Sequence, residues 1–231
     1  MNRWSKDFVD VFNSAAKNLS RAQLFDDFLK ISAATLRRDE KTFAEVPNKE
    51  LHNKLFGKLI GALEFNISAK ILRDHSLKLD YKIPFKPRYR DELGEIFHAL
   101  ELFDQGGGQV FTPQHVADIM GENTLTPEFV QRQLAEKGFI AIKEDCCGSG
   151  ALILGGLNAL LDQKINPTRF AFVAAADTDI RCVLMAFIQL SLYMIPAAVV
   201  QRNAVTDETF GEEFYTPSLK RIHYGNSNCE D

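Results

Sequence analysis

Residues 139–150, FIAIKEDCCGSG, join a short apolar run to a turn with two closely spaced glycines. The apolar residues 139–143 predict a buried strand, and residues 150–161 predict a helix directly after the turn. Glycines between a strand and a helix let the backbone approach a ligand and point amide groups at it. The three spaced glycines of the usual dinucleotide pattern are absent, so the turn by itself indicates only a candidate ligand site.

The chain around this turn alternates between strands and helices. The pattern predicts further strands at 169–176 and 197–201, a helix at 179–194 between them, and upstream helices at 112–120 and 127–137. Strand-helix-strand-helix-strand at this spacing predicts an α/β fold with a parallel, doubly wound sheet.

The first hundred residues predict helices instead. Trp4, Phe8, Phe12 and Ala15 recur at helical spacing. Ser20 and Gln23 fit a capping box that opens a second helix. A glycine-rich break at residues 104–108 separates a helical region, residues 1–105, from an α/β domain, residues 106–231.

The charge is divided unevenly between these regions. Residues 1–105 hold 18 Lys and Arg against 16 Asp and Glu, whereas residues 106–231 hold 9 against 15. Any contact with DNA phosphates is therefore expected in the front half. Within residues 78–90, cations alternate with aromatics, which is a pattern suited to nucleic acid: Lys82, Lys86, Arg88 and Arg90. The alternative is a solvated loop whose aromatics fold beneath the adjacent helices.

Cysteine content and hydropathy exclude several classes of protein. The four cysteines show neither a disulfide framework nor metal-ligand spacing. The N-terminus does not resemble a signal peptide. The longest apolar stretch, residues 182–200, is interrupted by Gln189, Ser191 and Pro196, which favours a buried helix and strand over a membrane span. We expect a cytoplasmic protein without membrane contact or bound metal.

Two polar residues follow the second and third predicted strands. Asp177 comes about thirty residues after the glycine turn, where a carboxylate can accept both ribose hydroxyls of a nucleoside. The alternative role for Asp177 is a helix N-cap, for which Asp179 competes. Asn203 could recognise an adenine amino group.

Four elements together resemble the N6-adenine DNA methyltransferase family, including modification subunits of type I restriction systems. They are residues 108–113 (GQVFTP), 144–150 (EDCCGSG, similar to the family's DPCCGSG), 177–179 (DTD) and 202–205 (RNAV). Residues 91–97 (DELGEIF) also resemble the helix that leads into these elements.

This resemblance implies a Rossmann-like S-adenosylmethionine-dependent methyltransferase fold, with a partial doubly wound sheet behind the helical region. It implies S-adenosylmethionine as cofactor and adenine in double-stranded DNA as target. The implied cofactor-binding residues are Phe111, Thr112, Pro113, Glu144, Cys146, Gly148, Ser149, Gly150, Asp177, Thr178, Asn203 and Ala204.

The family's catalytic Asn-Pro-Pro-Tyr or Asn-Pro-Pro-Phe loop is missing, since the sequence contains no Pro-Pro pair. The nearest substitute is residues 214–218, FYTPS, with Tyr215 as the candidate catalytic residue; the alternative for this stretch is a terminal turn. Asp145 also replaces the proline of the family's turn. The expected function is DNA adenine-N6 methylation in restriction-modification. The alternatives are an inactive relative that binds cofactor or DNA as a regulator or decoy, and a methyltransferase with another substrate.

The predicted sheet lacks the C-terminal strands of a full methyltransferase domain and would have an exposed edge. A partner protein that completes the sheet, the helical front half, or a natural short form of the domain could each account for this edge.

Overall fold

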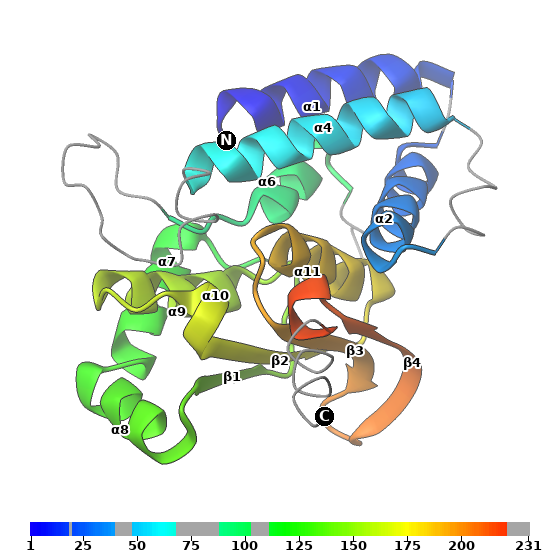
Figure 1. The fold of residues 1–231 in the computed structure, drawn as a ribbon. Helices are drawn as coiled ribbons and strands as arrows, with labels where there is room; N and C mark the ends of the chain where they lie inside the picture. Colours follow the sequence, from blue (N-terminus) through cyan, green and yellow to red (C-terminus); the bar gives the residue numbers. More distant parts are fainter. Residues whose placement is uncertain (19, 40–47, 68–87, 103–110, 221–231) are drawn as a thin grey trace, which may run out of the picture.

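A four-stranded sheet forms the centre of the α/β part of this computed structural model, which describes residues 1–18, 20–39, 48–67, 88–102 and 111–220. The strands run in the order β1-β2-β3-β4. They are β1 (Ile140–Glu144), β2 (Ala171–Asp177), β3 (Ala197–Asn203) and β4 (Glu208–Tyr215). The first three strands are parallel and β4 is antiparallel to β3. Because β1, β2 and β3 share one direction, the loops that follow them lie at the same end of the sheet (Figure 1).

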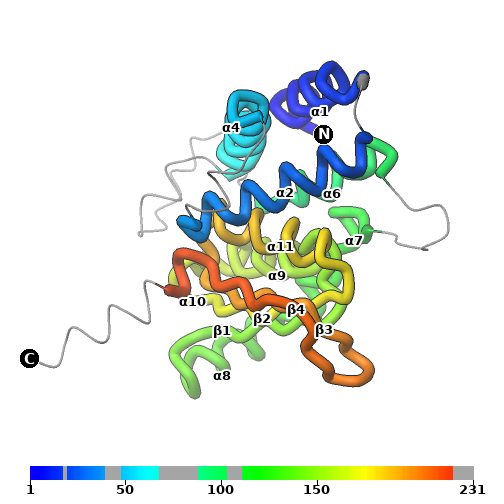
Figure 2. The backbone as a smooth tube through the Cα atoms, turned by 90° about the vertical axis from the view of Figure 1, so that its right-hand side faces the viewer, coloured from blue at the N-terminus to red at the C-terminus, as the bar shows by residue number. Residues whose placement is uncertain are grey.

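The two crossover helices lie on one face of this sheet. They are α9 (Ala151–Asp162) and α11 (Ile180–Leu192), and Figure 2 shows both above the strands. Each buries nearly its whole length, and the buried side chains join those of β2 and β3 in one apolar cluster. The α/β fold class predicted from the sequence is confirmed. The two crossover helices lie on one face of the sheet, and its fourth strand is antiparallel to the third.

The helix α7 (Gln114–Thr124) packs closely against α9. A Cβ atom at Gly155 would overlap the backbone of Ala117, and one at Gly121 would overlap the backbone of Gly155. Glycine at these positions lets the two helix backbones approach directly. Next along the chain come α8 (Pro127–Lys137), capped by Thr126, and later the short α10 (Pro167–Phe170).

The front of the chain forms a helical layer over α11 (Figures 1 and 2). It consists of α1 (Arg3–Ala15), η1 (Ala16–Asn18), α2 (Arg21–Arg37), α4 (Lys49–Asn66) and α6 (Glu92–Ala99). Phe8 and Phe12 of α1 pack with Phe25 and Phe28 of α2. Ser20 caps α2 by accepting from the amide of Gln23, as the capping box predicts. Among the described residues, no helix is long and apolar enough to span a membrane.

The sheet has two edges within the part of the chain that the structure describes. At one edge, Arg37 of α2 pairs with Glu212 of β4 at 2.5 Å and lies over the ring of Phe214. At the other edge, β1 pairs with β2 alone and borders a cavity of about 170 Å³ lined mainly by apolar side chains of α7, α9 and β1 itself. Within the described ranges, β1 is thus the strand next to which a further strand could pair, and the exposed edge expected from the sequence stays a prediction.

Some sequence predictions differ from the structure in detail. The strand β4 and the helix α10 were not predicted. The third strand continues to Asn203 instead of ending at residue 201. Residues 91–97, which resemble a helix of the family, fall at the N-cap and in the body of α6, Glu92–Ala99. The proposed domain boundary at residues 104–108 and the cations Lys82 and Lys86 lie outside the described residues.

Candidate cofactor site

The glycine turn after β1 has the backbone conformation that its sequence predicts. Gly148 has φ of 54° and Gly150 has φ of 106°, both in the left-handed region that favours glycine. Gly150 is also the N-cap of α9. A Cβ atom at Gly148 would lie 3.2 Å from the ring of Phe111, so the turn and the segment before α7 are in close contact.

The carboxylate of Asp177 lies against this turn. The amide of Gly148 donates to its Oδ2 atom at 2.8 Å, and the amide of Asp179 donates to its Oδ1 atom at 2.9 Å. The amide of Cys147 donates to the carbonyl of Ala176 at 2.8 Å, which ties the turn to the end of β2. Asp179, and not Asp177, is the N-cap of α11. The strand end thus presents Asp177, half-exposed, beside the glycine turn.

The segment Phe111, Thr112 and Pro113 forms one wall of a cleft of about 730 Å³. Phe111 packs edge-on against Phe97. The cleft lies between this segment, α6 and the start of α7. Its charged lining residues are Arg88, Arg90, Asp91, Glu95 and Asp118, and its histidines are His98 and His115. The glycine turn contacts Phe111 from the side, but it is not among the residues that line this cleft.

Asn203 ends β3 and organises the hairpin that leads to β4. Its side-chain oxygen accepts from the amides of Val205 and Thr206 at 2.9 and 3.3 Å. Ala204 is exposed in the same hairpin. The exposed Thr178 accepts at its carbonyl from Gln201 at 2.9 Å. Asn203 and Ala204, the residues predicted to contact adenine, are thus at the same end of the sheet as the glycine turn. The side-chain oxygen of Asn203 accepts hydrogen bonds within its own hairpin.

An ion pair that sequence reasoning missed connects the glycine turn to β3. Arg202 pairs with Asp145, the residue that replaces the family's proline, and with Asp207 at 2.8 Å. Lys143 also pairs with Asp145 at 2.8 Å. The hydrogen bond from Lys143, helped by the charge of Arg202, lowers the pKa of Asp145. Arg202 and Asp145 are 57 residues apart in the sequence, which is why no local pattern reveals their pair.

The remaining turn residues have structural contacts. Glu144 accepts from the amide of Cys146 at 3.1 Å. Cys146 is exposed, whereas Cys147 is buried and its burial raises the thiol pKa. A thiol with a raised pKa has little thiolate character. Cys147 thus packs as part of the apolar core, and Cys146 does not.

Tyr215 lies in the middle of the sheet, in the same row as Lys143 of β1 and Ala174 of β2, one row short of Glu144, after which the glycine turn begins. It pairs with Ala198 near the start of β3, whereas Asp177 pairs with Gln201 near the end of that strand. The neighbouring Thr216 is fully buried and clamps the start of β3: its hydroxyl donates to Ile195 and accepts from the amide of Ala197. Thr216 of the FYTPS stretch therefore has a structural role. Phe214 packs on Phe187 of α11, so Tyr215 points to the other face of the sheet. Its role as a replacement for the missing catalytic loop stays a prediction.

The two described cations of the basic segment are both ion-paired. Arg88 forms a two-pronged pair with Asp162 at the end of α9, with both N–O distances 2.8 Å. Arg90 pairs with Glu95 at 3.2 Å. These pairs fix the start of α6 on the α/β part of the molecule.

Asp91 is the residue at this site that sequence reasoning did not assign a role. It is buried, and its side chain accepts hydrogen bonds from Ser149 of the glycine turn, from Gln189 of α11 and from the amide of Gly94. Burial raises the pKa of the carboxyl group, and the three hydrogen bonds oppose that rise. The only indication in the sequence was that Asp91 belongs to the DELG stretch that resembles the family. Its contact with Ser149 could not be predicted, because the two residues are 58 positions apart.

Comparison with known proteins finds a fold-level likeness alone. No family model matches the chain, and no curated protein does. Among solved structures, a protein described as a class I S-adenosylmethionine-dependent methyltransferase from Listeria monocytogenes is similar at 14% identity with a TM-score of 0.47. A type I restriction-modification methyltransferase subunit from Streptococcus thermophilus is similar at 13% identity with a TM-score of 0.34.

The chain spans little more than half of these two structures. The similarity covers 86% and 89% of this chain, but only 53% and 58% of theirs. At such identities and TM-scores, neither similarity assigns a residue role or a substrate to this chain.

Proposed function

We propose that this chain binds S-adenosylmethionine at the carboxyl ends of β1 and β2, and that it acts in DNA adenine-N6 methylation of the restriction-modification type. The contact between the Gly148 amide and the Asp177 carboxylate carries the proposal. A carboxylate has about four acceptor positions. The hydrogen bonds described for Asp177 use two of them, so ribose hydroxyls can occupy others.

The neighbouring elements suit the rest of such a cofactor. The backbone amides of the turn and the N-terminus of α9 favour an anionic group. Phe111 lies directly against Gly148, so the segment before α7 borders the turn. Three of the four sequence elements that resemble the methyltransferase family thus meet in one place.

An inactive, cofactor-binding relative is the second candidate. Two observations favour it: the sequence has no Pro-Pro pair, and the FYTPS stretch contains no Asn or Asp. In this alternative the chain binds cofactor or DNA as a regulator or decoy. A partner protein that pairs with the open edge of β1 and supplies a catalytic loop would restore the first candidate.

Calorimetry with S-adenosylmethionine tests the shared part of both candidates. Asp177→Ala should weaken binding at least about tenfold, the effect of one lost buried hydrogen bond to a charged group. Gly148→Asp should abolish binding, because its side chain meets Phe111 and adds a negative charge beside Asp177. Thr126→Ala, which removes the cap of α8, is the matched control for general destabilisation. Unchanged binding in both site variants would refute the cofactor site.

Transfer of a labelled methyl group to unmethylated duplex DNA separates the two candidates. Incorporation into adenine supports the methyltransferase. Cofactor binding without incorporation, with and without host cell extract, supports the inactive relative. The same DNA in a binding assay tests the four cations of residues 82–90, whose replacement should reduce the salt dependence of affinity.

A further inference from the structure

Ser149, the middle residue of the glycine turn, is held by two buried side chains from outside the turn. Its hydroxyl donates to Oδ2 of Asp91, and its carbonyl accepts from the side chain of Gln189 at 2.8 Å. Gln189 also donates to Oδ1 of Asp91 at 2.9 Å. Ser149, Asp91 and Gln189 therefore form a closed triangle of hydrogen bonds, and all three side chains are buried.

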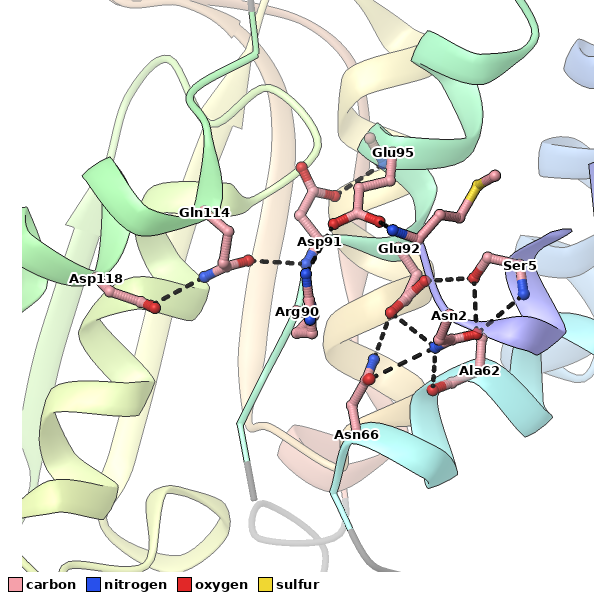
Figure 3. A network of polar contacts seen from close by, with 12 residues as sticks. Asn2, Ser5, Ala62, Asn66, Arg90, Asp91, Glu92, Glu95, Gln114 and Asp118 are labelled. Atoms are coloured by element: carbon pink, nitrogen blue, oxygen red, sulfur yellow. Dashed lines mark hydrogen bonds and ion pairs between the residues drawn. The ribbon is translucent and has the colours of Figure 1, made fainter. Parts of the chain in front are cut away.

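Asp91 connects this triangle to the segment before α7. Its own amide donates to the side chain of Gln114 at 3.0 Å, and Gln114 in turn donates to Asp118 (Figure 3). Gln114 directly follows Phe111, Thr112 and Pro113. Asp91 thus contacts both the glycine turn and the start of α7, and it also lines the cleft beside residues 111–113.

The local backbone is shaped for this contact. A Cβ atom at Gly94 would overlap the carboxylate of Asp91 and lie 2.7 Å from the hydroxyl of Ser149. The amide of Gly94 donates to Asp91 at 2.8 Å, so Asp91 is also the N-cap of α6. Glycine at position 94 is what permits the carboxylate to reach the turn.

We propose that Asp91 is a positioning residue for the cofactor site, which holds the glycine turn through Ser149 in the conformation that binds S-adenosylmethionine. The inference rests on the proposed function for its ligand. Asp91 acts on the ligand through Ser149 and Gln114. A hydrogen bond from a hydroxyl to a carboxylate is stronger than one between neutral groups, which suits this holding role.

Glu92 provides a matched control on the same helical turn. It is equally buried, but its carboxylate accepts from Ser5 of α1 and from Asn2 and Asn66. Figure 3 shows these partners on the opposite side of Asp91 from Gln114. Asp91→Ala and Glu92→Ala each remove a buried carboxylate that several donors contact. Both should destabilise the protein. Asp91→Ala also removes the N-cap of α6, a loss that Ser149→Ala avoids, so Ser149→Ala is measured beside it.

The test measures cofactor affinity and amide hydrogen exchange in the ligand-free protein. Asp91→Ala should raise the Kd for S-adenosylmethionine about tenfold and accelerate exchange in the peptide covering Gly148 to Ala151. Ser149→Ala should do the same. Glu92→Ala should change neither. Asp91→Asn should restore most of the affinity, because its oxygen can accept from Gly94 and Gln189 while its amide group donates to Ser149.

Each outcome decides between positioning and general stability. Equal changes in Kd and exchange for Asp91→Ala and Glu92→Ala would overturn the proposal. If Asp91→Ala does not fold, Ser149→Ala and Asp91→Asn carry the same comparison. If the wild type binds no S-adenosylmethionine, the proposed function fails. Faster exchange at the turn in Asp91→Ala would then still show that Asp91 holds the turn. Unchanged exchange in Asp91→Ala would refute the positioning role as well as the proposed function.

Discussion

The amide of Gly148 and the carboxylate of Asp177, 29 residues apart, are joined by a hydrogen bond of 2.8 Å across the ends of two adjacent parallel strands. A glycine-rich backbone and an acidic side chain are brought together there by the pairing of β1 with β2.

This contact should also contribute to stability. Asp177→Ala leaves the amides of Gly148 and Asp179 without their acceptor and should lower the free energy of unfolding by about 1–3 kcal/mol. Urea unfolding at neutral pH measures the change. Asp177→Asn, which keeps one oxygen, should recover part of the loss; equal stability of wild type and Asp177→Ala would show that the bond contributes nothing.

The close approach of α7 and α9 predicts opposite effects for two glycine-to-alanine substitutions. Gly155→Ala places a methyl group against the backbone of Ala117 and should destabilise the protein by about 1–3 kcal/mol. Gly57→Ala in α4 meets nothing within 4 Å and should stabilise it by up to about 1 kcal/mol through helix propensity. Thermal unfolding of both variants provides the comparison, and a shift in the same direction would contradict the packing described for α7.

Substitutions of Thr216 and Tyr215 can distinguish a structural role of the FYTPS stretch from a catalytic one. Thr216→Val removes the hydroxyl that serves Ile195 and Ala197, so stability should fall by about 1–3 kcal/mol for each buried group left unpaired. Tyr215→Phe changes an exposed side chain and should alter stability by less than about 0.5 kcal/mol. Cofactor affinity should be unchanged in Tyr215→Phe; a large loss there would return Tyr215 to the site.

The buried carboxyl of Glu92 predicts a pH dependence of stability. Burial raises its pKa above the ordinary value of 4.5, so the folded state binds this proton more tightly than the unfolded state. The stability that results is fully present below pH 4.5 and is lost as the pH rises through the folded pKa. Urea unfolding of wild type and Glu92→Gln should therefore diverge as the pH rises toward about 7, with the wild type losing stability relative to the variant. If the stabilities of wild type and Glu92→Gln change in parallel with pH, the raised pKa of Glu92 is contradicted.

Apolar periodicity and capping residues predicted most of the elements. The helix α8 begins and ends at the predicted residues, because Thr126, Pro127 and Gly138 mark its ends. The strands β1 and β2 were found to within two residues. Their apolar runs reflect burial beneath helices, which is a local signal.

The strand β4 had no such signal. Seven of its eight residues are exposed, so its sequence, ETFGEEFY, shows no apolar alternation that would set it apart from a loop. Its pairing with β3 depends on the hairpin at Asn203 and on Thr216.

Long-range polar contacts at the site were equally hidden. From the sequence, either Asp177 or Asp179 could be the N-cap of the following helix. The structure shows that Asp179 is the N-cap of α11. The hydrogen bond between Asp91 and Ser149 joins two segments that are far apart in the sequence, and neither segment's own residue pattern indicates the other. Such contacts follow from tertiary packing, which a single sequence does not display.

The strand order has a consequence for biosynthesis. Each strand of this sheet pairs with the strand that comes next in the chain, so pairing never has to wait for a distant later segment. As the polypeptide leaves the ribosome, β2 can add to β1, β3 to β2, and the hairpin partner β4 last, in the order of translation. The loop to be closed is short for β4 and about one helix long for the parallel pairs, which keeps the entropy of each closure modest.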